Sequence, residues 1–117
     1  MDREGSLMQD TYMLLEDAQK KYLAAIESER ENGEALSDAT REYRVAIESK
    51  TLELRMEKGY PVTLIPDLVR GSAEVAPLGY ERDRIRANYD ADRSLVEFWK
   101  QRVYILQRQI ELESKGL

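Results

Sequence analysis

The chain has 117 residues, a net charge of −5, no cysteine and no histidine. The length fits one compact domain or one coiled-coil unit. Without cysteine and histidine the chain has no disulfide, no thiolate metal site and no imidazole base, which excludes most enzyme classes. We therefore expect no catalytic residues, no metal ligands and no cofactor.

The composition favours long helices. Ala, Glu, Lys, Leu and Arg make up about half of the chain, which is typical of coiled coils. All three prolines and three of the six glycines lie between residues 59 and 79, and such a cluster of helix breakers predicts a loop between two helices. We expect a single all-α domain over residues 1–117, folded as a long antiparallel helical hairpin with coiled-coil packing.

The first helix is expected over about residues 7–58. Its heptad register runs through Asn32-Gly33 without a shift, which favours one continuous helix. An Asn-Gly pair is also a good helix stop, so a break there, which would give a third helix, is the alternative. The expected seam of this helix includes Tyr12, Gln19 and Ile26.

The second helix is expected over about residues 80–115 and carries the clearest pattern. Its seam residues step alternately by four and three, which predicts a left-handed coiled coil. Asp92 is the one polar member, and it should reach an arginine or solvent, or help to fix the register. The candidate core or oligomer seam consists of Tyr89, Val96, Trp99, Val103, Leu106 and Ile110.

Apolar residues also fill positions beside this seam. Leu95 falls at heptad position g, and Phe98, Ile105 and Leu112 fall at position c. One partner helix does not cover so wide an arc. The two helices also differ in expected length, so residues 7–25 should overhang the hairpin. Both features predict a homo-oligomer, most simply a dimer, and favour a protein partner.

The connecting segment, residues 59–79, is expected to be structured. Gly59 suits the left-handed position that ends a helix, and Thr63 and Ser72 are suited to capping the helices that follow. The segment also holds apolar side chains that should either pack on the hairpin or form a partner site, and packing is the preferred interpretation. These side chains are Val62, Leu64, Ile65, Leu68 and Val69.

Basic residues open the second helix and continue along it at intervals of seven. Such a stripe could track phosphates, but the acidic excess of the chain repels them. A solvated face with ion pairs between Arg86 and Asp90 and between Arg93 and Glu97 is therefore the preferred interpretation. The candidate nucleic-acid face consists of Arg82, Arg84, Arg86, Arg93 and Lys100.

The sequence predicts a cytoplasmic protein without a membrane partner. No apolar run approaches the ~18 residues of a membrane span. The first residues lack the basic and then apolar plan of a signal peptide.

The loop Gly-Tyr-Pro-Val-Thr-Leu-Ile-Pro-Asp-Leu-Val-Arg-Gly over residues 59–71, set between two long helices, resembles small helical-hairpin proteins of phages and prophages. The stretch from Tyr89 to Trp99 is more loosely similar to phage recombination mediators. That similarity implies a helical, oligomeric protein that loads a recombinase onto single-stranded DNA. Mediators should carry a basic DNA-binding segment, whereas the loop holds only Arg70.

The predicted function is that of a non-enzymatic, self-associating coiled-coil interaction protein encoded by a phage or prophage. The first alternative is an accessory nucleic-acid-binding protein of replication or recombination. The second is a secreted helical hairpin of the Trp-x-Gly type. Trp99 argues against that second alternative, because it lies inside a predicted helix and Lys100-Gln101 follows it.

Overall fold

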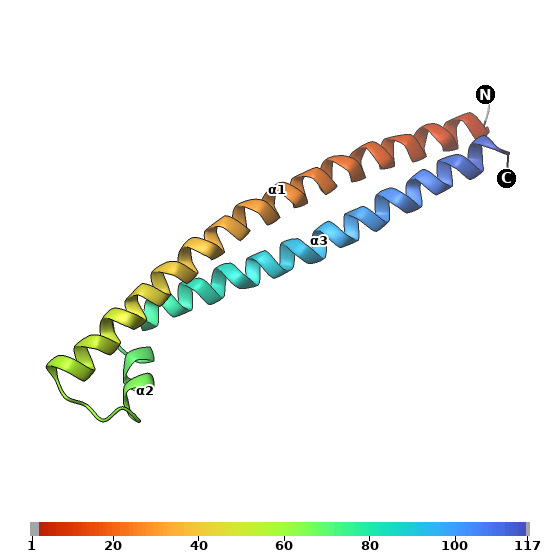
Figure 1. The fold of residues 1–117 in the computed structure, drawn as a ribbon. Helices are drawn as coiled ribbons and strands as arrows, with labels where there is room; N and C mark the ends of the chain where they lie inside the picture. The colour runs from red at the N-terminus through yellow and green to blue at the C-terminus, as the bar shows by residue number, and fades with distance from the viewer. Residues whose placement is uncertain (1–2, 117) are drawn as a thin grey trace. The chain divides into compact units, whose positions relative to one another are not determined.

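The computed structural model describes residues 3–116, with side chains from residue 7 onward. The elements in chain order are the helix α1 (Arg3–Leu52), the π-helical turn η1 (Glu53–Glu57), the short helix α2 (Ile65–Arg70) and the helix α3 (Ala76–Ser114) (Figure 1). The fold is all-α, and α1 and α3 pack antiparallel, which confirms the predicted helical hairpin.

The chain divides into two compact units, and each contains part of α1 and part of α3. We call Met1–Arg30 with Asp90–Leu117 the terminal unit, and Glu31–Tyr89 the loop unit. The loop unit also contains η1 and α2.

Helix α1 runs through Asn32-Gly33 as one helix of 50 residues. The alternative of a break there, with a third long helix, is therefore wrong. Glycine serves a packing purpose at this position, because a Cβ atom on Gly33 would lie 3.3 Å from Cε2 of Tyr89. The missing side chain leaves room for the tyrosine ring of α3.

The π-helical turn η1 follows directly on the end of α1. The N–H of Lys58 donates to the carbonyl of Glu53 at 3.2 Å, which closes the π-helical turn. Gly59 then has a φ of 64°, and the N–H of Tyr60 donates across it to the carbonyl of Leu54 at 3.1 Å. Gly59 thus takes the predicted left-handed position, where a residue without a Cβ atom meets no steric penalty.

Helix α2 packs against the end of α1 and forms the core of the loop unit. Leu54, Ile65, Val69 and Val75 are at most 5% exposed and form one cluster. Two of the five apolar residues of the connecting segment therefore pack as predicted. The other three are exposed: Val62 by 66%, Leu64 by 52% and Leu68 by 41%.

Neither expected capping side chain caps a helix. The N-cap residue of α2 is Leu64, which makes no side-chain cap bond, so Thr63 does not cap it. The hydroxyl of Ser72 donates to the carbonyl of Val69 at 2.7 Å. The backbone carbonyl of Ser72 accepts from the N–H of Ala76 at 2.9 Å, and α3 begins at that residue without a hydroxyl cap.

In the terminal unit, small side chains of α1 pack against α3. Thr11, Ala18 and Ala25 are 3%, 2% and 7% exposed. At these three positions the seam of α1 therefore lies one residue earlier in the chain than the sequence predicted. Small side chains allow the two helices to approach closely and still pack at crystal-like density. The residues expected in the seam are exposed instead, namely Tyr12, Gln19 and Ile26.

Contacts along the terminal unit show that residues 7–25 do not overhang. The hydroxyl of Thr11 donates to a carboxylate oxygen of Glu113 at 3.1 Å, and Nζ of Lys21 lies 5.1 Å from the ring centroid of Trp99. The predicted overhang is therefore wrong. The additional length of α1 lies in the loop unit, where α2 packs on it.

We predict that Gly79→Ala destabilises the loop unit. A Cβ atom on Gly79 would lie 3.0 Å from Cε2 of Tyr43, and that ring packs against the core with the guanidinium of Arg82 4.4 Å from its centroid. The ring has little freedom to move away, so overpacking should cost about 1–3 kcal/mol in the free energy of unfolding, measured by urea titration.

The matched control is Gly71→Ala. A Cβ atom there would meet only the carbonyl of Asp67, at 3.4 Å, and the φ of −87° suits any residue. We expect no loss of stability. Equal losses for the two variants would contradict the packing of Tyr43 against Gly79.

Candidate interaction surfaces

The predicted seam of α3 faces α1 within the chain. Leu106 is 1% exposed, and the other five seam residues are half-buried. Asp92 is 9% exposed, and it accepts a hydrogen bond from the hydroxyl of Ser28 on α1 at 2.9 Å. The hairpin thus uses this seam itself, and its buried carboxylate has a polar partner on the opposite helix, as buried charges require.

Trp99 lies in the seam and contacts Phe98, which lies at the outer edge of the terminal unit. The Phe98 ring meets the Trp99 ring edge-on, with centroids 4.8 Å apart and an interplanar angle of 83°. The ammonium group of Lys21 lies near the indole, where the π-system attracts a cation. Phe98 itself remains 55% exposed, so the aromatic pair extends from the seam to solvent.

A row of large apolar side chains borders the seam in the terminal unit. With Thr11, Ala18 and Ala25 at position d of α1, Leu7 and Leu14 fall at position g. The g positions of two antiparallel helices border the same edge of their seam. The row, which we call the outer apolar stripe, is 40–57% exposed and consists of Leu7, Leu14, Leu95, Phe98, Ile105 and Leu112.

The register places the four α3 residues of the outer apolar stripe as neighbours. On α3, Phe98, Ile105 and Leu112 repeat every seven residues, and Leu95 precedes them by three, so they form one line on the helix surface. The sequence predicted the α3 part of the stripe. The α1 part was not predicted, because its position beside the seam depends on Thr11, rather than Tyr12, being the seam residue.

The loop unit holds a separate apolar cavity between α2 and the end of α1. Its volume is about 260 Å³, and Ile65 and Val69, which are 3% and 2% exposed, form its floor. Arg55 and Arg70 also line it. We call it the cap pocket, and its full lining is Ile47, Thr51, Arg55, Val62, Ile65, Pro66, Val69 and Arg70.

The basic residues at the start of α3 point in different directions. Arg82 lies over the Tyr43 ring and pairs with Asp83 at 2.8 Å. Arg84 pairs with Glu81, and the hydrogen bond between them raises the pKa of Arg84 and lowers that of Glu81. Both arginines are therefore already engaged by carboxylates.

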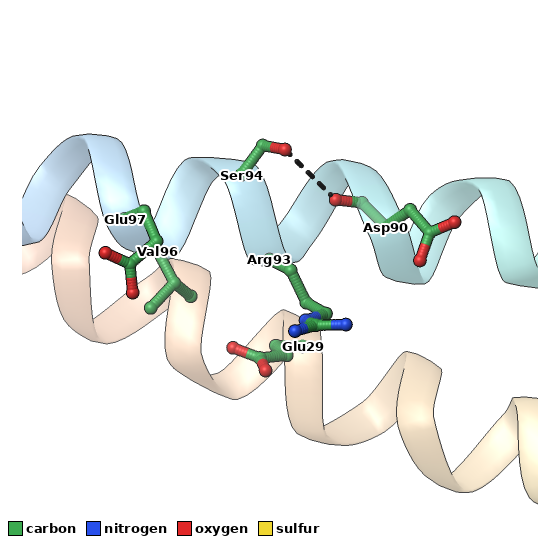
Figure 2. A pocket seen from close by; sticks show the side chains of 6 residues that line it. All are labelled: Glu29, Asp90, Arg93, Ser94, Val96 and Glu97. Carbon is green, nitrogen blue, oxygen red and sulfur yellow. Dashed lines mark hydrogen bonds between the residues drawn. The ribbon is translucent and has the colours of Figure 1, made fainter.

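The remaining candidates for a nucleic-acid face lie at heptad position e. Arg86 does not pair with Asp90 within residues 3–116. In the terminal unit, Figure 2 shows the guanidinium of Arg93 directed toward Glu29, in a hollow that Asp90 and Glu97 also line. Acidic side chains around Arg93 disfavour a phosphate there. Lys100 is exposed.

Three arginines that lack ion pairs within residues 3–116 line a groove of about 490 Å³ in the loop unit. Arg41 and Arg44 come from α1 and Arg86 from α3, with Glu48 beside them. Sequence reasoning missed the two α1 arginines. Ser37, Arg41 and Arg44 are spaced at i, i+4 and i+7, which places all three on one helical face. This spacing could have identified the two arginines from the sequence.

Comparison of the chain with protein-family models, with curated proteins and with solved structures finds no match. No helix within residues 3–116 is long and apolar enough to cross a membrane. The same residues contain no group of three or more carboxylates placed to hold a metal ion. The surfaces described above are therefore the basis for proposing a function.

We predict weak binding of single-stranded nucleic acid with a modest dependence on salt. Arg82 and Arg84 are engaged by Asp83 and Glu81, which leaves at most three of the five candidates for contacts with phosphates. The slope of log K against log salt should be no steeper than about −2, whereas five phosphate contacts give about −3.5. Fluorescence anisotropy of a labelled oligo(dT), titrated with salt, measures this slope.

The double variant Arg82→Gln/Arg84→Gln serves as the control and should leave the slope unchanged. A slope near −3.5 in the unmodified protein, or a shallower slope in this variant, would show that all five residues act together.

Proposed function

We propose that the protein is a non-enzymatic, self-associating interaction protein whose terminal units dimerise through the outer apolar stripe. The observation that carries the proposal is the stripe itself, six large apolar side chains 40–57% exposed along one edge. Burial of apolar surface stabilises association by roughly 25 cal/mol per Å². Contiguous apolar patches of this kind mark interaction sites on soluble proteins.

A second copy of the chain is the partner that matches the stripe. Its residues are the leucine, isoleucine and phenylalanine types that fill helix-bundle cores, and they repeat with heptad spacing. Two hairpins that pack stripe against stripe around a two-fold axis form a four-helix bundle. In such a bundle the exposed residues become core, while the seam of each hairpin stays as it is.

The absence of histidine and cysteine from the sequence supports a role without catalysis. Nucleic-acid binding ranks second, because Arg82 and Arg84 are already engaged by Asp83 and Glu81. Phage origin rests on the sequence resemblance, and the neighbouring genes test it. Capsid or tail genes favour an assembly role, and a recombinase gene favours the mediator role.

We predict that Phe98→Glu/Ile105→Glu converts a dimer into a monomer. Four carboxylates at a two-fold interface would have to be desolvated without partners, which is strongly unfavourable. Both side chains are more than 50% exposed, so the helical circular dichroism should not change. Sedimentation velocity at tens of micromolar measures the association state.

Met56→Glu is the matched control, because Met56 is 79% exposed and belongs to the loop unit. It should remain dimeric. An unmodified protein that sediments as a monomer, or a Phe98→Glu/Ile105→Glu variant that remains dimeric, contradicts the proposal.

A further inference from the structure

The cap pocket has a size that suits one large side chain. Its volume is about 260 Å³, below the roughly 300–1,000 Å³ of pockets that enclose small molecules or cofactors. The floor is buried and apolar, formed by Ile65 and Val69. Val62 stands at the margin, 66% exposed, so an apolar group that enters the pocket also covers this valine.

The charge of the lining is entirely positive. Arg55 and Arg70 are the only charged residues among the eight that line the pocket. Neither arginine has an ion pair or a hydrogen bond within residues 3–116. Other cations of the same region are paired, since Lys50 lies 3.1 Å and Lys58 lies 3.9 Å from carboxylate oxygens of Glu53. The pocket arginines are thus available to a partner.

An apolar cavity bordered by available arginines matches an acidic ligand with a bulky apolar group. Guanidinium groups bind carboxylates through two parallel hydrogen bonds. A seated apolar or aromatic anchor flanked by arginines is also the usual composition of an interface hot spot. The basic groove of Arg41, Arg44 and Arg86 differs, because it includes the carboxylate of Glu48.

We propose that the cap pocket binds an acidic peptide segment of another protein, with one large apolar side chain in the pocket and flanking carboxylates on Arg55 and Arg70. This partner site lies in the loop unit, whereas the outer apolar stripe lies in the terminal unit. The inference therefore does not depend on dimerisation, and either can fail without the other.

A model peptide tests the proposal on the full chain. The probe is acetylated and amidated Asp-Glu-Phe-Glu-Asp, titrated into ¹⁵N-labelled protein while amide shifts are followed. We expect the shifts to concentrate on residues 47–55 and 62–70. Replacing the central Phe by Ala should weaken binding about tenfold, because the buried apolar area is lost. Replacing the acids by Asn and Gln should weaken binding about five- to tenfold.

Two double variants separate the site from general electrostatics. Arg55→Gln/Arg70→Gln should weaken binding of the acidic peptide about five- to tenfold. Arg41→Gln/Arg44→Gln removes the same charge from the same unit but lies outside the pocket, and it should stay within about twofold, because screening limits the reach of exposed charges. Circular dichroism confirms that both variants fold.

Several results would overturn the proposal. The neutral peptide could bind as tightly as the acidic one, or both double variants could weaken binding equally. Pocket amides that shift with protein concentration alone would assign the pocket to a second copy of the chain. Shifts with dodecanoate but not with the acidic peptide would assign it to a fatty acid.

Discussion

The close approach of α1 to α3 in the terminal unit determines what the rest of that unit can do. The approach depends on Thr11, Ala18 and Ala25, which are almost fully buried. Because these side chains are small, the larger residues of α3, such as Trp99 and Leu106, fill the seam. Other large apolar residues of both helices lie outside the seam. Six of them form the outer apolar stripe, which is the surface that the proposed self-association would bury.

In the loop unit the short helix α2, rather than α3, covers the end of α1. Its part of α1 continues well beyond the level at which α3 begins, and α2 packs on the additional length through Ile65 and Val69. A six-residue helix covers only part of that surface. The cap pocket, with Arg55 and Arg70 at its border, is the part left open. The chain therefore presents an apolar surface in one unit and an apolar, positively charged one in the other.

Much of the fold could be predicted, because the spacing of apolar residues and of helix breakers is a local property. Leu106 of the predicted α3 seam is buried and its other five members are half-buried, so the spacing of large apolar residues indicated the face of α3 that packs on α1. The seam of α1 was wrong by one residue at several steps, since hydrophobicity selects Tyr12 and Ile26, while the fit to a facing helix selects Thr11 and Ala25. The cap pocket combines two segments, so no single stretch of sequence indicates it.

The stability of Ala25→Leu tests this account most directly, with Ala24→Leu as the control. Ala25 is 7% exposed, and Ala24 is exposed. If small side chains set the distance between α1 and α3, the added volume at residue 25 should cost about 1–3 kcal/mol in the free energy of unfolding. Ala24→Leu should change it little. An Ala25→Leu variant as stable as the unmodified protein would contradict the account, because the seam would then accept a large side chain at this position.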